Sequence, residues 1–405
     1  MRKLALLISL VLIQFGSIAQ IDTNILLISK IDAFPQFQVA DGNTIYMMGF
    51  TELMGAPIDI PAPTLNFTEG DSVKLDLWNL SQGPPHTIHL HGLDVNQAND
   101  GVPSLSFAVP HDSTGSYIFE APHPGTYIYH CHETSVLHVQ AGMYGMVIIR
   151  PQVDTLTWGG GYSFHSEKTW MTSEIDTNWH VDSIINHDYD PGATTHDVLD
   201  YEPQFFLVNG RSDQQLSGSS SELQGSVGEI IYMRLANIGY CGNKFVFPAE
   251  LNAKIISSDG RPLPSEIIND TAIVLPGERY GVLLEASSVL LDSIRVDYFS
   301  LNTGAVKNTQ KIQVDISGYL GTNELDLSDV LIYPNPTSEG LTIRFDETFG
   351  EIKRIFVRGM IGQTLKSYIS DNELINLDLK DLNTGSYFVE IEIGNSRISK
   401  LIIKH

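Results

Sequence analysis

Residues 129–143 read YHCHETSVLHVQAGM and set a cysteine between two histidines, followed by a third histidine and a methionine. The side chains concerned are His130, Cys131, His132, His138 and Met143. Thiolate and thioether sulfurs combined with imidazoles suit copper, whereas structural zinc sites prefer closed tetrahedral sets. The stretch therefore indicates a copper site.

A second histidine-rich stretch, PHTIHLHG, occupies residues 85–92. Because strand side chains alternate between two faces, His130 and His132 share one face and Cys131 points to the other. His89 and His91 share a face for the same reason. We therefore expect one copper inside a sandwich, bound by Cys131, His86, His138 and Met143.

The remaining histidines of the two stretches project outward as two pairs, available for a second metal centre at a domain boundary. These are His89, His91, His130 and His132. Cys131 is joined through the chain to its two neighbouring histidines, which gives electrons a short covalent route between the centres.

The length of the chain indicates more than one domain, and its charge limits the possible partners. A chain of 405 residues is too long for one ordinary domain. With 48 acidic against 24 basic residues, nucleic acid and anionic membranes are poor partners.

The first 20 residues read as a secretory signal peptide. Arg2 and Lys3 precede an apolar run at residues 4–13 that is too short to span a bilayer, and Ser17-Ile18-Ala19 offers a small-residue cleavage site. No other segment reads as a membrane span, so we expect an exported protein.

Cys131 and Cys241 are the two cysteines, and the default for a pair in an oxidising compartment is a disulfide. The position of Cys131 among histidines favours a metal ligand instead, and Cys241 reads as a small buried hydrophobe. Capped or core positions are expected for His111, His123, His165, His180, His187 and His196.

Short runs rich in Val, Ile, Tyr and Phe alternate with turn residues, as in residues 72–78 and 125–129, which predicts an all-β fold of Greek-key β-sandwiches. The predicted blocks are a copper-binding sandwich at residues 21–151, a second sandwich without copper ligands at 152–317, a linker at 318–330 and a small β-sandwich at 331–405.

The copper motifs resemble the cupredoxin domains of multicopper oxidases, the laccase-like enzymes. Residues 86–92 resemble that family's HxxHxHG motif, and residues 130–132 resemble its HCH motif. The resemblance implies a type 1 copper bound by His86, Cys131, His138 and Met143. It implies a type 2 ligand at His89 and type 3 ligands at His91, His130 and His132.

Shorter motifs extend the resemblance over residues 35–315. They are PAPT at 61–64, EGD at 69–71 and DGVP at 100–103 in the first block, and NGR at 209–211, DG at 259–260 and PGERY at 276–280 in the second. The second block thereby resembles the family's middle, cupredoxin-like domain.

The third block resembles a C-terminal sorting domain of the type IX secretion system. YPNP at 333–336, GSYF at 385–388 and the basic end at 400–404 carry that likeness. It implies export across an outer membrane, to the cell surface or beyond. The alternative is a small carbohydrate-binding or adhesive sandwich.

The family's oxygen-reducing cluster takes twice as many HxH-type pairs as this chain supplies, and the second block contains none. Three arrangements remain open. Two copies could pool their histidines in a homo-oligomer. A mononuclear type 2 copper could form, as in copper nitrite reductase, or only the type 1 copper could bind, as in an electron-transfer protein.

The function we expect is a copper-dependent oxidoreductase of laccase type. Its partners would be a small-molecule or metal-ion electron donor, such as a phenol, Cu(I) or Fe(II), and dioxygen as the acceptor, with nitrite as the alternative acceptor. The catalytic residues would be His89, His91, His130 and His132.

Overall fold

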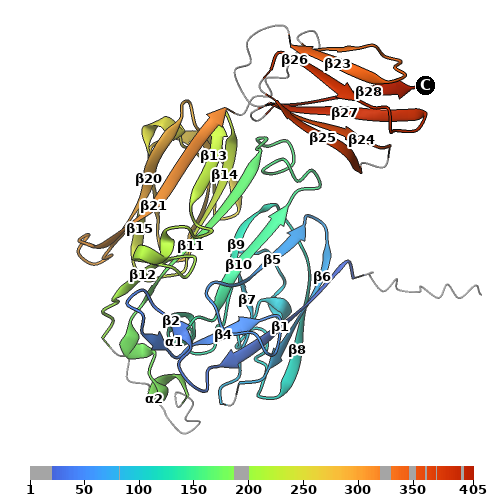
Figure 1. The fold of residues 1–405 in the computed structure, drawn as a ribbon. Coiled ribbons are helices and arrows are strands. Elements are labelled where there is room, and N and C mark those ends of the chain that lie inside the picture. Colours follow the sequence, from blue (N-terminus) through green and yellow to red (C-terminus); the bar gives the residue numbers. More distant parts are fainter. Residues whose placement is uncertain are drawn as a thin grey trace, which may run out of the picture. The chain divides into compact units, whose positions relative to one another are not determined.

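The computed structural model describes residues 21–81, 83–186, 200–319, 330–345, 353–360, 363–370, 372–393 and 396–405. It forms two compact units, Met1–Gly318 and Tyr319–His405 (Figure 1). The predicted signal peptide, His187, His196 and most of the predicted linker lie outside the described residues.

The first unit begins with a β-sandwich of two four-stranded sheets. One sheet has the order β4-β1-β6-β8, formed by Met48–Thr51, Thr23–Ile31, Ser72–Asn79 and Ser113–Glu120. The other has the order β5-β10-β9-β7, formed by Ala62–Thr68, Tyr144–Arg150, Gly125–His130 and His89–His91. The shorter elements are β2 (Phe37–Gln38), β3 (Thr44–Ile45), η1 (Gln97–Asn99) and α1 (Ser135–Gln140).

A second sandwich follows in the same unit. Its larger sheet has the order β12-β11-β14-β19-β16-β17, formed by Phe205–Val208, Ser166–Ile175, Ile230–Asn237, Arg279–Glu285, Lys254–Ser258 and Arg261–Ile268. Its smaller sheet has the order β13-β21-β20-β15-β18, formed by Leu223–Val227, Val306–Tyr319, Leu290–Phe299, Gly242–Val246 and Thr271–Val274. Short helices are η2 (Thr177–Trp179), α2 (Asp182–Ile185), η3 (Asp213–Leu216) and η4 (Ala249–Leu251).

The second unit, taken by itself, is a smaller sandwich. It has one sheet of β22 (Val330–Tyr333), β23 (Gly340–Phe345) and β26 (Leu374–Asp378) and another of β25 (Thr364–Ser370), β24 (Lys353–Arg358), β27 (Gly385–Ile393) and β28 (Ser396–Lys404). The predicted all-β class is confirmed.

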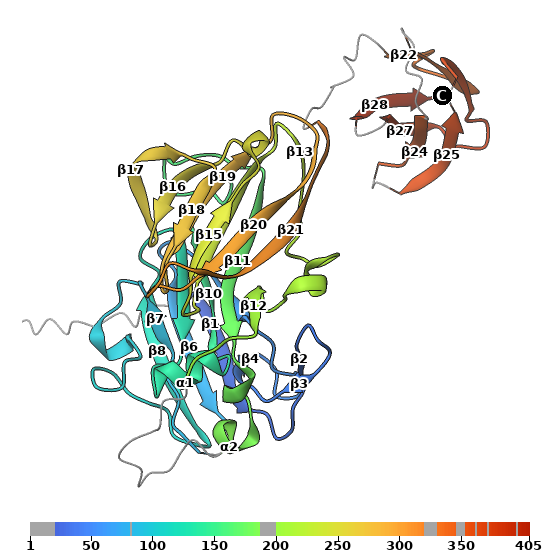
Figure 2. The same cartoon turned by 90° about the vertical axis from the view of Figure 1, so that its left-hand side faces the viewer.

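Burial alternates along β6, in the first sheet of the first sandwich. In β6 every second side chain, from Val73 to Asn79, is buried, and those between them are partly exposed. Parallel pairing of β1 with β6 and of β5 with β10 joins strands that are distant along the chain, so connections must cross between sheets. Within the first unit the two sandwiches lie one above the other in both ribbon views (Figure 1, Figure 2).

The central strand β9 differs from β6 because it is buried along its whole length. Tyr127, Tyr129 and the following Cys131 pack into the core of the first sandwich. Ile128 faces the other way, into an apolar cluster that also contains Met171 and other side chains of the second sandwich. The second sandwich therefore covers the outer face of β9, and this face leads to His130.

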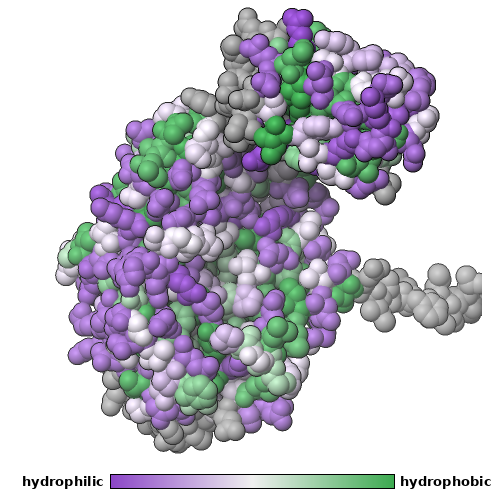
Figure 3. Space-filling view, in the orientation of Figure 1, coloured by the Kyte–Doolittle hydropathy of each residue, from purple (hydrophilic) through white to green (hydrophobic). Residues whose placement is uncertain are grey.

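Among the described residues, none of the helices has the length and apolar character needed to cross a bilayer. Hydrophilic residues, with apolar ones scattered between them, cover much of the face shown in Figure 3.

A buried carboxyl group lies on β11 in the second sandwich, close to α1 of the first. Glu174 is 4% exposed, and its Oε2 accepts hydrogen bonds from the Tyr240 amide (2.7 Å) and the Tyr201 hydroxyl (3.2 Å). Its backbone carbonyl accepts one from Gln140 Nε2 of α1 (3.1 Å). A side chain at Gly239 would meet the carboxyl oxygens at 2.4 Å, so the glycine leaves the carboxyl its space.

This carboxyl should make stability depend on pH. Burial raises the pKa of Glu174 from 4.5 to about 7, so the folded chain holds a proton that the unfolded chain releases between these values. Relative to Glu174→Gln, the free energy of unfolding of the wild type should therefore fall as pH rises from about 5 to about 8. Urea unfolding followed by tryptophan fluorescence measures the difference.

Glu285→Gln is the matched control, because Glu285 is exposed on β19. The free energy of unfolding of this variant should still fall as pH rises from about 5 to about 8, because Glu174 is retained. Parallel pH profiles for the wild type and Glu174→Gln would contradict the prediction.

Candidate metal centres

Three predicted ligands come together in the core of the first sandwich. His86 precedes β7 and is held by a bridge to Val109, Cys131 follows β9, and His138 lies in α1; all three side chains are fully buried. Cys131 Sγ lies 3.2 Å from His138 Nδ1 and 3.6 Å from His86 Nδ1. One ligand atom from each residue fits within 4.8 Å of the others, as a shared ion requires.

Met143 lies beside this set through its backbone. Its carbonyl accepts a hydrogen bond from the Cys131 amide (3.0 Å), and its own amide donates to the His138 carbonyl (2.9 Å). Its side chain is fully buried in the same apolar cluster as Cys131. Met143 thus lies next to the buried set in the fold, and the role of its thioether as axial ligand stays a prediction.

The electrostatics of the set suit a metal. Burial lowers the pKa of His138 to about 4 and that of His86 well below its ordinary value, so both imidazoles are neutral near pH 7. Burial raises the pKa of the Cys131 thiol to about 11, and a bound metal would displace that proton. Two buried Nδ1 atoms turned toward one sulfur fit the His₂Cys arrangement of blue copper sites.

Thr87 connects the buried set to its surroundings. Its amide donates to Cys131 Sγ (3.5 Å), and its Oγ1 accepts a hydrogen bond from the His132 amide (2.8 Å). The sulfur therefore has a fixed hydrogen-bond donor in addition to the two imidazoles.

The other four predicted histidines gather on the outer face. Strand β7 pairs with β9 so that His89 lies directly opposite His130, with ring centroids 5.1 Å apart. Ligand atoms of His89, His91 and His130 lie within 4.8 Å of one another. The His132 ring lies 5.1 Å from that of His89.

Two backbone carbonyls select which ring nitrogen each histidine presents. His89 Nδ1 donates to the Asp100 carbonyl (2.7 Å), and His130 Nδ1 donates to the Cys131 carbonyl (2.8 Å). Each hydrogen bond leaves Nε2 as the nitrogen free to bind a metal. Burial lowers the pKa of His130 to about 3 and that of His91 to about 4, so these rings are also neutral near pH 7.

The sequence did not predict the part that Asp100 plays, because a backbone carbonyl acts through position and any residue supplies one. The available signal is Gly101. It has φ +77°, and a Cβ there would lie 2.0 Å from the Ile88 carbonyl oxygen, so only glycine lets this loop reach the histidine strand.

Among the described residues, neither ligand group contains Cys241 or any of the histidines expected at capped or core positions. Of these histidines, His180 is buried, whereas His111 and His165 are exposed. Cys131 and Cys241 do not form a disulfide, and Cys241 is buried in the core of the second sandwich. Hydrogen-bond partners are present for His111, His123, His165 and His180.

Two stretches of the chain match known protein families. Residues 38–154 match the family model described as multicopper oxidase, and residues 331–405 match that of a secretion system C-terminal sorting domain. The stretch that contains both histidine motifs therefore resembles multicopper oxidases, and the C-terminal stretch resembles a sorting domain, as the sequence predicts. The family binds copper, and a sorting domain implies export to the cell surface or beyond.

Relatives cover only parts of the chain. Laccase 1 of Metarhizium acridum is 32% identical over 176 residues, 41% of this chain and 28% of that protein. A copper-containing nitrite reductase of Neisseria meningitidis is 32% identical over 96 residues, 23% of this chain and 24% of that protein. The chain thus spans less than a third of the length of these relatives.

The fold also has a counterpart among solved structures. The blue copper oxidase of Nitrosomonas europaea matches with a TM-score of 0.57 and 23% sequence identity, over 73% of this chain and 86% of that one. This likeness extends the cupredoxin-like architecture beyond the first sandwich.

The thiol of Cys131 should decide the colour of the copper-loaded protein. Cys131→Ser should abolish the intense blue absorption, because the thiolate ligand is lost. The metal-free variant should remain folded, with its stability changed by about 1–2 kcal/mol, since the core is otherwise intact. Visible absorption after copper loading and urea unfolding of the apo protein measure the two effects.

Cys241→Ser is the matched control and should keep the blue absorption, because Cys241 lies in the other sandwich. Retention of the blue band by Cys131→Ser would exclude the cysteine as a copper ligand.

Proposed function

We propose that the protein is an exported, laccase-type copper oxidoreductase that couples one-electron oxidation of a phenolic or metal-ion donor to reduction of dioxygen. The supporting observation is that two ligand sets are joined at a single tripeptide. Cys131 belongs to the buried set and is flanked in the chain by His130 and His132 of the outer set. The hydrogen bond from His130 Nδ1 to the Cys131 carbonyl adds a second connection.

In this proposal His86, Cys131, His138 and Met143 hold a type 1 copper, and the four outer histidines hold the reacting centre. When bound, copper would supply one-electron transfer at the first set and reduction of the acceptor at the second. The chain's own residues fix the ligand geometry. Complete burial excludes water from the first set, and the carbonyls of Asp100 and Cys131 orient the imidazoles of the second.

The donor would approach α1, the helix that carries His138. Val136 in this helix is 52% exposed, although the buried ligand lies only two residues further along the chain. The formal net charge of −24 favours cationic donors such as Cu(I) or Fe(II) through electrostatic steering.

A second candidate is a nitrite-reductase-like enzyme with one type 1 and one type 2 copper. It is favoured by the three-imidazole group of His89, His91 and His130, which is sufficient for a mononuclear ion. The match to a copper-containing nitrite reductase agrees with this alternative. A third candidate is an electron-transfer protein that fills only the buried set.

Among the described residues, the second sandwich contributes no side chain to either ligand group. We propose that the further ligands of an oxygen-reducing cluster come from another copy of the chain in a homo-oligomer, since symmetry duplicates the histidine surface. Export would use the type IX route implied by the sorting domain, across an outer membrane.

Copper content and acceptor choice separate the candidates. About four coppers per chain favour the oxidase, about two the reductase and about one the carrier. Oxygen uptake with a phenolic donor should be measured beside nitrite consumption on the same copper-loaded sample. Nitrite turnover without oxygen uptake would favour the reductase over the laccase-type enzyme. If the sample shows neither activity, the electron-transfer protein is the remaining candidate.

Removal of outer histidines should reduce turnover without removing the blue absorption. The double variant His89→Ala/His132→Ala should keep the blue absorption and lose turnover by at least about tenfold, because metal at the outer set is weakened. Oxygen uptake at saturating donor measures the loss.

His123→Ala controls for histidine removal as such, because the half-exposed side chain of His123 is paired with Asp94 and belongs to neither ligand group. It should turn over at the wild-type rate. Normal turnover by the double variant would mean that the outer set is not the reaction centre.

A further inference from the structure

The strand that carries two of the outer histidines has little support of its own. β7 contains only His89–His91 and lies at the edge of its sheet, where it pairs with β9 alone. A three-residue edge strand has few backbone hydrogen bonds to hold two imidazoles at a fixed separation. Other parts of the molecule must therefore contribute to the position of His91.

The structure brings a turn of the second sandwich against this strand. The turn, residues 275–278, connects β18 to β19 and is closed by a hydrogen bond from the Leu275 amide to Glu278 Oε2 (2.7 Å). The Gly277 amide donates to the carbonyl of Asn237, a buried residue of β14 (2.8 Å). The turn is thus tied to the body of the second sandwich.

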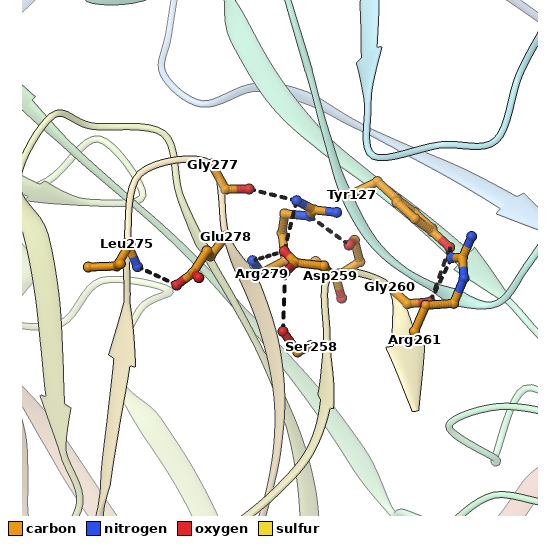
Figure 4. A network of polar contacts seen from close by, with 10 residues as sticks. Tyr127, Ser258, Asp259, Gly260, Arg261, Leu275, Gly277, Glu278 and Arg279 are labelled. Carbon is orange, nitrogen blue, oxygen red and sulfur yellow. Dashed lines mark hydrogen bonds and ion pairs between the residues drawn. The ribbon is translucent and has the colours of Figure 1, made fainter. Parts of the chain in front are cut away.

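Arg279, at the start of β19, has its guanidinium fixed at the boundary between the two sandwiches. Its side chain is 4% exposed, Nη1 donates to the Gly277 carbonyl (2.6 Å), and Nη1 lies 2.9 Å from Asp259 Oδ1 (Figure 4). Nε donates to the carbonyl of Thr126 on β9 (3.4 Å). A buried charge is stable only when it is paired in this way.

The remaining edge of the guanidinium lies against the residue that follows His91. A Cβ placed on Gly92 would lie 2.1 Å from Arg279 Nη2 and 2.9 Å from Cζ, so the Gly92 backbone rests directly on the cation. A Cβ on Gly277 would lie 3.2 Å from His91 Cε1 and 3.3 Å from Nε2, so the turn borders the imidazole edge. The second sandwich therefore lies against both His91 and Gly92.

We propose that Arg279 is a positioning residue for the outer histidine set, through which the second sandwich, itself without copper ligands, holds His91 in place. This inference rests on the proposed function in so far as it concerns metal. An arginine remains protonated in proteins and cannot bind a cation, so its effect is exerted through the Gly92 backbone.

The test compares Arg279→Leu with Arg261→Leu. Arg261 lies at the same boundary, where its Nη1 donates to Tyr127 Oη (3.0 Å; Figure 4) and its Nη2 donates to Asp94, beyond the end of β7. Loss of Arg279 leaves Asp259 half-exposed rather than stranded in the interior. If Arg279→Leu does not fold, Arg279→Gln takes its place, because it keeps hydrogen-bonding capacity without the charged fork.

Two measurements are made on each variant. Hydrogen exchange of the metal-free protein should show faster exchange at His91 and Gly92 in Arg279→Leu and no change in Arg261→Leu. Titration of the apo protein with Cu(II), followed by electron paramagnetic resonance, should show binding at the non-blue site weakened by about tenfold or more in Arg279→Leu alone, with the blue site unchanged.

Equal exchange rates and equal non-blue copper affinities in the two variants would overturn the inference. If the wild type itself binds copper only at the blue site, the proposed function fails instead, and the exchange rates at His91 and Gly92 alone decide whether Arg279 positions β7.

Discussion

Burial of β9 on both faces is the constraint on which the arrangement of the predicted metal ligands depends. A strand such as β6, whose sheet has one partly exposed face, needs apolar side chains on the other face only, whereas β9 is enclosed by the opposite sheet and by the second sandwich. Two-residue periodicity then sends Cys131 inward and His130 outward. The two ligand sets are therefore separated by the thickness of one strand while they remain adjacent in the chain.

Much of this could be predicted from residues 85–92 and 129–143. The alternation of side chains, together with the soft character of a thiolate flanked by imidazoles, was sufficient to divide the ligands into a buried and an outer set. The all-β class followed from short runs of β-branched and aromatic residues. These inferences are local, because each depends on residues close together in the sequence.

Long-range contacts could not be predicted in the same way. The PGERY motif was visible, but nothing in its letters says that Arg279 rests on Gly92, since this contact depends on how the two sandwiches pack. The Asp100 carbonyl that orients His89 is a backbone atom and leaves no mark on residue choice. The burial of Glu174 beside Tyr201 and Tyr240 likewise could not be predicted, because nothing in the sequence distinguishes it from an exposed acidic residue.

The dual contact of Thr87 has a consequence for how the two ligand sets communicate. Its amide is directed at the Cys131 sulfur, and a donor in this position withdraws electron density and so tunes the reduction potential of a thiolate-bound copper. Its hydroxyl oxygen at the same time holds the amide of His132. If both predicted sites bind copper, a shift of His132 at the outer site would move Thr87 and, with it, the hydrogen bond to the Cys131 sulfur.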